Sequence, residues 1–398
     1  MKVYIISKEP FPNGMAATNR IKCYAKALIY AGIHCEVIIF TRTEIFGQVA
    51  KNTKGYGSFE NIPYQYIGKT PLRHKNIFIR QINDRLDILK LCKFLNKNLD
   101  KGDIVIGYIG YYSSSIHYII DTIHKKKAKF VRELCELPYG TVQETNKIIK
   151  LRNKSFTKQF PKCDGFIAIS ETLVNIAQQY KNPTAKIIKI PILVDYNKYC
   201  LEDLASESKT PYIFHSGTLY EQKDGILSML EAFGMAIKKL PFTIHFILTG
   251  EKDKSPHKDD IDKLIDKYDM KDKVLFKGYL SDSELKDYLS MATLVIINKY
   301  DNLQNKYCFS TKLAEYLAAG KPVIITKVGE STNWLTNNKN AYIIEPGNTK
   351  LLASTVIRAF TEKQERMNIA EQGRNICKKS FDYHTYGLNL KLFFQSIQ

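Results

Sequence analysis

The chain has 398 residues, of which 44% are hydrophobic, and carries a formal net charge of +19. This length is comfortable for two domains, and the apolar fraction is typical of a globular protein with a buried core. No apolar run reaches the roughly 20 residues that a membrane-spanning helix needs, and the first residues show no cleavage-site pattern, so we expect neither a transmembrane protein nor a signal peptide.

The cysteines indicate the cellular compartment of the protein, and the charge distribution indicates the kind of partner that it binds. The eight cysteines are scattered without a C-x-x-C pair, which favours reduced thiols in a cytosolic protein over a disulfide framework or a zinc site. Residues 1–200 contain 32 Lys and Arg against 15 Asp and Glu, whereas the remainder contains 27 against 25. The excess of +17 in the first half predicts an anionic surface or a phosphorylated acceptor as its partner. Nucleic acid would also match this charge, but the sequence has no aromatic-rich RNA motif or basic recognition helix, so we expect no nucleic-acid binding.

The first half alternates predicted strands and helices. It begins with a strand at 3–7, a loop, a helix at about 16–30 and a strand at 35–40, and residues 41–75 are loop-rich and polar. Further strands are expected at 103–110, 129–134, 165–170 and 187–192. This alternation predicts a doubly wound parallel sheet.

The loop before the first helix contains Gly14. A glycine there lets a ligand approach the backbone closely, although a plain turn accounts for it equally well. The loop lacks a G-x-G-x-x-G pattern, so a nicotinamide cofactor is unsupported.

Two basic amphipathic segments lie in the first half, at residues 73–97 and 147–160. The first mixes apolar residues with eight cationic side chains, His74 included. Such a helix can lie on an anionic membrane, or it can be a surface helix of the sheet; both interpretations stay open.

Glu133 and Glu136 follow the predicted strand at 129–134. Ligands of parallel sheets bind at the carboxyl ends of the strands. Either glutamate could therefore contact an acceptor or act as a base, and a surface loop is the alternative for each.

The second half repeats the strand and helix series after a polar, acidic linker at residues 201–210. Strands are expected at 212–216, 242–250, 274–278, 294–298 and 341–345, with helices between them and at the end of the chain. Gly217 lies at a strand end, and Lys223 is placed to reach a diphosphate from the same loop, although alone it would be an ordinary surface lysine. The turn at Gly278 and Tyr279 leaves backbone groups free at another strand end, where a nucleobase could be read.

Residues 308–326 predict a helix followed by a short buried strand. Ser310 or Thr311 can cap the helix start, and Gly320 can end it. The unpaired N–H groups and the positive dipole end of such a helix form an anion site.

Two charged residues strengthen the prediction of an anion at this helix. Lys312 stands in the first turn, where the dipole does not favour a cation, which makes sense if an anion sits opposite. Glu315 lies one turn further along the same face. The pair suits a phosphate attached to a hydroxyl-bearing sugar, and the alternative is an ordinary amphipathic helix with both side chains solvated.

Taken in order, these stretches resemble a glycosyltransferase of the GT-B fold, family GT4. The resemblance covers nearly the whole chain and rests on an ordered set of segments: the Gly14 loop, residues 164–170, residues 190–195, residues 217–225 and residues 312–323. It implies an α/β protein with two Rossmann-like doubly wound parallel-sheet domains facing across a cleft. Residues 1–200 would bind the acceptor, residues 201–380 would bind the nucleotide sugar, and a last helix at about 383–398 would pack back on the first domain.

The resemblance also implies a donor site in the second domain. Lys223 and Lys312, with Glu315, would be the catalytic residues: the lysines and the helix tip would hold the diphosphate, and Glu315 would accept hydrogen bonds from the ribose. The family is retaining and needs no bound metal; we expect no cofactor, and UDP rather than GDP in the donor. The expected donor contacts are Gly14, Gly217, Thr218, Gly278, Tyr279, Ser310, Thr311 and Glu315.

Three positions depart from the family pattern. Tyr307 stands where a second glutamate is frequent, and Thr218 stands where an arginine is usual, which removes one cation from the diphosphate site. The family's frequent amino-terminal histidine has no clear match, and His117 is the candidate for it.

The sequence therefore predicts a retaining hexosyltransferase that moves a sugar from a nucleoside diphosphate sugar to a glycan or polyprenyl-linked acceptor, in cell-surface polysaccharide synthesis. We expect it in the cytoplasm or peripherally on the inner face of the cell membrane. The alternatives are a GT-B nucleotide-sugar epimerase and a non-catalytic nucleotide-sugar-binding protein.

Overall fold

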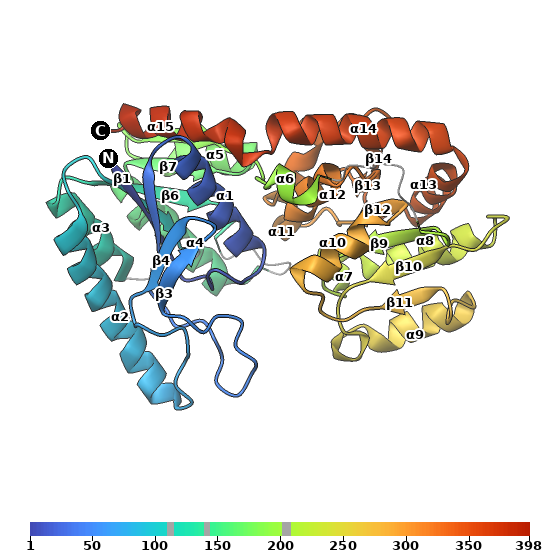
Figure 1. Cartoon of the computed structure of the whole chain (residues 1–398), viewed down its shortest axis with the longest axis horizontal. Helices are drawn as coiled ribbons and strands as arrows, with labels where there is room; N and C mark the ends of the chain where they lie inside the picture. The colour runs from blue at the N-terminus through green and yellow to red at the C-terminus, as the bar shows by residue number, and fades with distance from the viewer. Residues whose placement is uncertain (110–114, 139–143, 201–207) are drawn as a thin grey trace. The chain divides into compact units, whose positions relative to one another are not determined.

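The computed structural model describes residues 1–109, 115–138, 144–200 and 208–398. The chain divides into two compact units, one formed by Met1–Val194 with Tyr383–Gln398 and the other by Asp195–Asp382. Each unit is built on its own sheet (Figure 1). The sequence placed the division at residue 200, but the helix at 196–199 packs against the helix at 311–318 and so belongs to the second unit. Most of the expected linker, residues 201–207, lies outside the described residues.

The first unit contains an eight-stranded sheet with the order β3-β4-β2-β1-β5-β6-β7-β8. The pair β3 and β4 is antiparallel, and the other neighbours are parallel. The strands are β1 (Lys2–Ser7), β2 (His34–Ile39), β3 (Tyr56–Phe59), β4 (Ile62–Tyr66), β5 (Ile104–Tyr108), β6 (Lys129–Leu134), β7 (Gly165–Ala168) and β8 (Lys186–Lys189). The helices are α1 (Ala16–Tyr30), α2 (Ile77–Asn98), α3 (Ser115–Lys125), α4 (Asn146–Lys158), α5 (Glu171–Tyr180) and α15 (Gly387–Ser396), with short 3₁₀ turns at Phe160–Lys162 and Tyr383–Tyr386.

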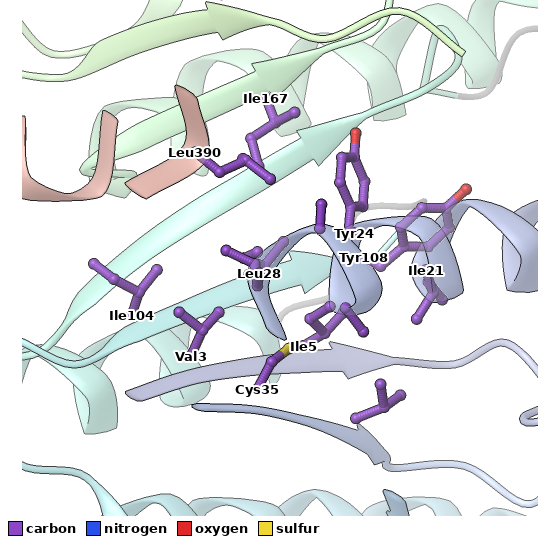
Figure 2. Close-up of a cluster of buried hydrophobic side chains, with 14 of the residues drawn as sticks. Val3, Ile5, Ile21, Tyr24, Leu28, Cys35, Ile104, Tyr108, Ile167 and Leu390 are labelled. Carbon is purple, nitrogen blue, oxygen red and sulfur yellow. The ribbon is translucent and has the colours of Figure 1, made fainter. Parts of the chain in front are cut away.

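The core of the first unit lies between this sheet and α1. Figure 2 shows Ile21, Tyr24 and Leu28 of α1 among the side chains of the strands, Val3 and Ile104 included. Spacings of three and four residues place the α1 residues on one helix face. The central strands are apolar throughout because both faces of the sheet are covered.

The last helix, α15, returns to the first unit and packs on α1. Leu390, which Figure 2 shows, belongs to the same buried cluster, as do Phe393 and Phe394. A Cβ at Gly387 would lie 2.4 Å from the backbone oxygen of Ala27. Glycine at this position therefore permits the close approach of the two helices.

The prediction that residues 41–75 are loop-rich was wrong in part, because they include β3 and β4. Ile62, Tyr64 and Tyr66 are buried in alternation along β4, which pairs in parallel with β2. Pro63 hid this pattern from sequence analysis, since proline is usually a breaker within strands. It is accommodated because the pairing of β4 with β2 covers only Tyr64, Gln65 and Tyr66, so Pro63 lies outside that ladder and faces Ser58 of the edge strand β3.

The second unit contains a six-stranded parallel sheet with the order β11-β10-β9-β12-β13-β14. The strands are β9 (Tyr212–His215), β10 (His245–Leu248), β11 (Val274–Phe276), β12 (Leu294–Ile297), β13 (Val323–Thr326) and β14 (Tyr342–Ile344). The helices are α6 (Tyr196–Tyr199), α7 (Glu221–Asp224), α8 (Ile226–Ile237), α9 (Lys258–Lys267), α10 (Asp282–Ser290), α11 (Leu303–Lys306), α12 (Thr311–Ala318), α13 (Thr349–Thr361) and α14 (Lys363–Ser380), with 3₁₀ turns at Lys252–Lys254 and Gly329–Asn333.

Within the described parts of the chain, no helix combines the length and the hydropathy that a bilayer span requires. The eight cysteines are free thiols.

Candidate functional site

The carboxyl ends of the second unit's strands carry most of the residues that the sequence singled out. All neighbouring strands of this sheet are parallel, so their carboxyl ends share one edge. Strand β9 ends at His215 and leads through Gly217 into α7, while β13 is preceded by α12. Ligands of doubly wound sheets bind at this edge.

An ion pair joins the β9 loop to α12. Lys312 Nζ donates to Asp224 Oδ1 at 2.7 Å, and the other oxygen of Asp224 accepts from the backbone N–H and the hydroxyl of Thr218, at 3.1 and 2.9 Å. The Asp224 side chain is only 3% exposed. Burial by itself would raise the pKa of Asp224, but the Lys312 ammonium outweighs it and holds the pKa well below its usual range. In this structure the charge of Lys312 is therefore already compensated by a buried carboxylate, which the sequence did not indicate.

His215 lies next to this pair and is 1% exposed. Its Nδ1 lies 2.8 Å from the backbone oxygen of Ile296, which can only accept, so Nδ1 carries the proton. Burial, reinforced by the Lys312 charge, lowers the pKa of His215 to about 4. The ring is therefore neutral at pH 7, and its Nε2 is an acceptor with no hydrogen-bond partner among the described residues.

Lys299 adds a further cation that sequence analysis missed. It follows β12, whose end is tied to the β9 side of the sheet by a hydrogen bond from Asn298 Nδ2 to the backbone oxygen of Gly225, 3.0 Å long. Lys299 Nζ donates to Asn305 Oδ1 at 3.2 Å. Burial lowers the pKa of Lys299, and the charges of Lys312 and Lys223 lower it further while Asp224 raises it. Its place directly after a buried strand is a signal that sequence reasoning could have used.

Lys223, by contrast, is exposed at the end of α7 and makes no hydrogen bond or ion pair among the described residues. Its charge nevertheless acts on Lys299. We call Lys223, Lys299 and Lys312, together with Asp224 and His215, the lysine cluster. With the histidine neutral, three ammonium groups face one carboxylate, so the lysine cluster carries an excess of positive charge.

The first turn of α12 borders the lysine cluster. Ser310 is the N-cap residue and makes no side-chain hydrogen bond to the helix, and Thr311 is half-buried. The buried Tyr316 fixes this helix to the β9 loop, because its hydroxyl accepts from the backbone N–H of Ser216 at 2.8 Å and lies 2.9 Å from the Ser216 hydroxyl. The helix start and its N–H groups are thus held beside Gly217 without a side-chain cap.

Glu315 lies one turn further along α12 and near α6. Burial raises its pKa to about 7, while Lys198 and a hydrogen bond with Tyr199 oppose the rise. At neutral pH a large share of this carboxyl is protonated, which leaves a hydrogen-bonding group with variable charge on the face that carries Lys312.

The loops after β10 and β11 complete this edge of the sheet. Thr249 Oγ1 accepts from the Gly217 N–H at 2.8 Å, and Gly250 N–H donates to the Gly278 oxygen at 2.8 Å. Tyr279 beside them is exposed. The expected donor residues Gly217, Gly278 and Tyr279 therefore lie on neighbouring loops.

The departures from the family pattern also have visible positions. Thr218 caps the Asp224 carboxylate instead of supplying a cation, and Tyr307 is half-buried where α11 ends. The site thus has a threonine anchored to Asp224 where an arginine was expected, and Lys299 supplies a cation from a different strand end.

In the first unit, Glu133 occupies the strand end that the sequence indicated, but its carboxylate is engaged. Arg20 Nε donates to it at 2.7 Å, and the Arg20 guanidinium also donates to the backbone oxygens of Pro191 and Ile190. Burial raises the pKa of Glu133, and Arg20 lowers it. Both side chains are buried, so the geometry favours a structural ion pair over the acceptor contact or base that was considered.

The other candidates in the first unit are Glu136, His117 and Gly14. The two side chains are at least partly exposed, and the glycine has a conformational role. Glu136 is exposed after β6, and His117 is half-buried on α3, where burial and the Lys162 charge lower its pKa. A Cβ at Gly14 would lie 2.0 Å from the Thr18 hydroxyl oxygen, so glycine here permits the loop to fold onto α1.

Comparison with known proteins agrees with this geometry. Residues 201–376 match the model of the family described as glycosyl transferases group 1. The second unit is a group 1 glycosyltransferase domain. The matched segment ends inside α14 and includes the whole lysine cluster.

A curated relative aligns over part of the chain. N-acetyl-alpha-D-glucosaminyl L-malate synthase of Bacillus anthracis is 22% identical over 224 residues, which are 55% of this chain and 56% of the relative. The match therefore spans little more than half of that protein.

Solved structures match the whole fold. Sucrose-phosphate synthase from Thermosynechococcus elongatus aligns with a TM-score of 0.73 at 15% identity, covering 100% of this chain and 98% of the other. Anabaena HepE in complex with UDP aligns with a TM-score of 0.70 at 16% identity, covering 100% of both chains. The group 1 glycosyltransferase domain and the first unit together have the GT-B fold, which confirms the predicted fold class.

Proposed function

We propose that the protein is a retaining hexosyltransferase of family GT4 that transfers a sugar from a UDP-sugar to a glycan or polyprenyl-linked acceptor. The observation that carries the proposal is the excess positive charge of the lysine cluster beside the uncapped start of α12. A nucleoside diphosphate sugar carries one negative charge on each phosphate, which matches two ammonium groups left after one is paired with Asp224. The complexes of Anabaena HepE with UDP and with UDP-glucose support a uridine nucleotide.

The chemistry follows from where charge develops. As the bond between the sugar and the diphosphate breaks, negative charge grows on the leaving phosphate, and the Lys312 ammonium and the N–H groups of α12 stabilise it. Asp224 holds Lys312 in place in the free protein, so little reorganisation is needed when the donor arrives. We propose no metal and no cofactor for this step.

We further propose that the acceptor belongs to cell-surface polysaccharide synthesis and that the enzyme works in the cytoplasm, at the inner face of the cell membrane. The basic first half supports this location. Among structural neighbours, Staphylococcus aureus TarM was solved with UDP and a GlcNAc-glycerol compound.

A thermal-shift screen of the full chain against nucleoside diphosphates and their sugars tests the donor. A ligand present at about 100 times its dissociation constant should stabilise the fold by about 2.7 kcal/mol, with UDP compounds ahead of GDP compounds. Absence of any nucleotide-dependent shift would contradict the proposal. Product analysis with and without acceptors then separates a transferase from an epimerase, and donor binding without turnover across an acceptor panel would indicate a binding protein.

Lys299→Ala is expected to weaken UDP binding about tenfold, since it removes one of two uncompensated cations from the lysine cluster. Isothermal titration with UDP measures the change. Lys263→Ala on α9 is the matched control, because that lysine is exposed and pairs with Asp260 in its own helix. Equal affinity of Lys299→Ala and wild type would exclude Lys299 from the diphosphate site.

Donor affinity is expected to depend on the pH through Glu315. With a pKa of about 7 in the free protein, the ionised form that accepts from ribose hydroxyls is about a tenth of the population at pH 6, so affinity for a UDP-sugar should be about tenfold weaker there than at pH 8. Titrations at the two pH values measure this, and Glu315→Gln should remove the difference.

The same raised pKa predicts a stability change in the free protein. The unfolded-state pKa of Glu315 is near the ordinary value of 4.5. Between pH 4.5 and about 7 the folded state therefore binds more protons at Glu315 than the unfolded state does. The contribution of Glu315 to stability is complete below pH 4.5 and is lost as the pH rises through 7. Glu315→Gln should flatten this decline in thermal denaturation, and an identical decline in the variant would contradict the assignment.

A further inference from the structure

Helix α2 exposes a continuous apolar strip. Phe78 and Leu89 are 72% and 65% exposed, and Ile82 and Leu86 between them are exposed as well. Spacings of four, four and three residues place all four on one face of the helix. The helix is held to the unit from its other side by the buried residues Asp87, Leu91 and Leu95. We call the strip formed by Phe78, Ile82, Leu86 and Leu89 the α2 face.

Cations border the α2 face and carboxylates do not. Arg85 and Lys93 are exposed and stand three or four residues from members of the strip. Asp84 is two residues from both Ile82 and Leu86 and therefore points to another side of the helix. Asp87, the other acidic residue of α2, is buried with Arg42 at 3.4 Å and Lys90 at 3.3 Å.

An apolar loop lies beside the start of α2. Ile45, Phe46 and Val49 are exposed on it. The loop is tied to the segment before the helix, because the Arg73 backbone N–H donates to the Glu44 oxygen at 2.9 Å. The exposed apolar surface thus extends beyond α2 onto the neighbouring loop.

Clustered apolar side chains in water mark an interaction surface, whereas single ones do not. A helix with an apolar strip and basic borders lies in the interface of an anionic bilayer, with its apolar side chains at the boundary of headgroups and acyl chains. Basic residues near such a surface are attracted to the anionic headgroups. The +17 charge of residues 1–200 acts in the same direction.

We propose that the α2 face and the 45–49 loop dock the first unit on an anionic lipid surface. Phe78, Ile82, Leu86 and Leu89 enter the boundary layer, and Arg85 and Lys93 contact the headgroups. This gives the membrane location proposed above a defined surface, and it stands on the first unit alone, without requiring the sugar-transfer activity.

Co-sedimentation of the full chain with vesicles tests the proposal. Wild type should bind vesicles of phosphatidylcholine mixed equally with phosphatidylglycerol, bind neutral phosphatidylcholine vesicles weakly, and lose anionic binding at high salt. Phe78→Ser/Leu89→Ser should weaken binding by about tenfold or more, because the two most exposed of the four apolar side chains of the α2 face are removed. Arg85→Gln/Lys93→Gln should weaken binding at low salt and reduce its salt dependence.

The matched control is Leu388→Ser/Leu392→Ser on α15 of the same unit. These leucines are also exposed and four residues apart, and the control should bind as wild type does. Circular dichroism and thermal denaturation verify that each variant folds. Since the replaced side chains are solvent-exposed, loss of vesicle binding with an intact fold supports the α2 face as the surface that contacts the lipid.

Several outcomes would overturn the proposal. These are no preference of wild type for anionic vesicles, unchanged binding by Phe78→Ser/Leu89→Ser, and an equal loss in the α15 control. Two further outcomes would assign the surface to another partner: stronger capture by oligonucleotides than by vesicles, or a dimer in sedimentation that the α2 variant dissociates while no vesicles bind. The nucleotide-induced thermal shift, measured on the same samples, reports on the donor site separately.

Discussion

Lys312→Ala is expected to lower turnover with any accepted donor by at least about tenfold, because it removes the cation that we propose stabilises the leaving diphosphate. It is also expected to destabilise the free protein, since Asp224 is buried and would lose its only ion-pair partner in the described structure. Steady-state kinetics with a UDP-sugar and an acceptor measure the first effect, and urea denaturation measures the second.

A second variant separates the two effects. Lys223→Ala is also expected to lower turnover at least about tenfold, but Lys223 is exposed and unpaired among the described residues, so stability should stay as in wild type. In Lys312→Ala/Asp224→Asn the buried charge is removed with its partner, which should recover part of the stability without recovering turnover. Unchanged turnover in both single variants would remove the proposed mechanism.

Gly217→Ala is expected to abolish nucleotide binding and to destabilise the second unit by about 1–3 kcal/mol, the usual cost of overpacking. The added Cβ would lie 2.5 Å from His215 Nε2, 2.6 Å from Lys312 Nζ and 3.0 Å from Asp224 Oδ2. The lysine side chain can move, but the His215 ring is buried and held by its bond to Ile296. Relief therefore has to displace Lys312 or the β9 loop, and either change disturbs the proposed diphosphate site.

Gly347→Ala is a useful reference for this prediction. A Cβ there meets no atom within 4 Å, but the backbone has a φ of +76°, so the variant reports strain without crowding. It should lose some stability and retain the UDP-induced thermal shift. Retention of full UDP affinity by Gly217→Ala would show that the space beside His215 is not used by the donor.

The order of strands and helices was predictable because hydrophobic periodicity and turn residues are local signals. The strand at 294–298, the helix at 16–30 and the returning terminal helix all have close counterparts in β12, α1 and α15. β4 was missed because Pro63 interrupts a pattern whose alternation is otherwise clear. The units divide at Val194, a few residues before the predicted boundary at residue 200, because α6 packs on α12, which local sequence does not reveal.

The site was predictable only as a set of strand ends. Position alone identified Gly217 and Gly278, and helix-start chemistry identified Lys312. The partner of Lys312 lies 88 residues earlier in the chain, and the partner of Glu133 lies 113 residues earlier. Such pairings depend on the tertiary fold. No local pattern could therefore show that Asp224 compensates the charge of Lys312 or that Arg20 forms an ion pair with Glu133.

The return of α15 has a consequence for recombination between homologous enzymes. The chain leaves the first unit at Val194 and re-enters it at Tyr383, so a chimaera made with one crossover would join the first 194 residues of one parent to the terminal segment of the other. Leu390, Phe393 and Phe394 would then meet a foreign surface. Exchange of the second unit between relatives should therefore use two junctions, so that Tyr383–Gln398 stay with the first unit of their own parent.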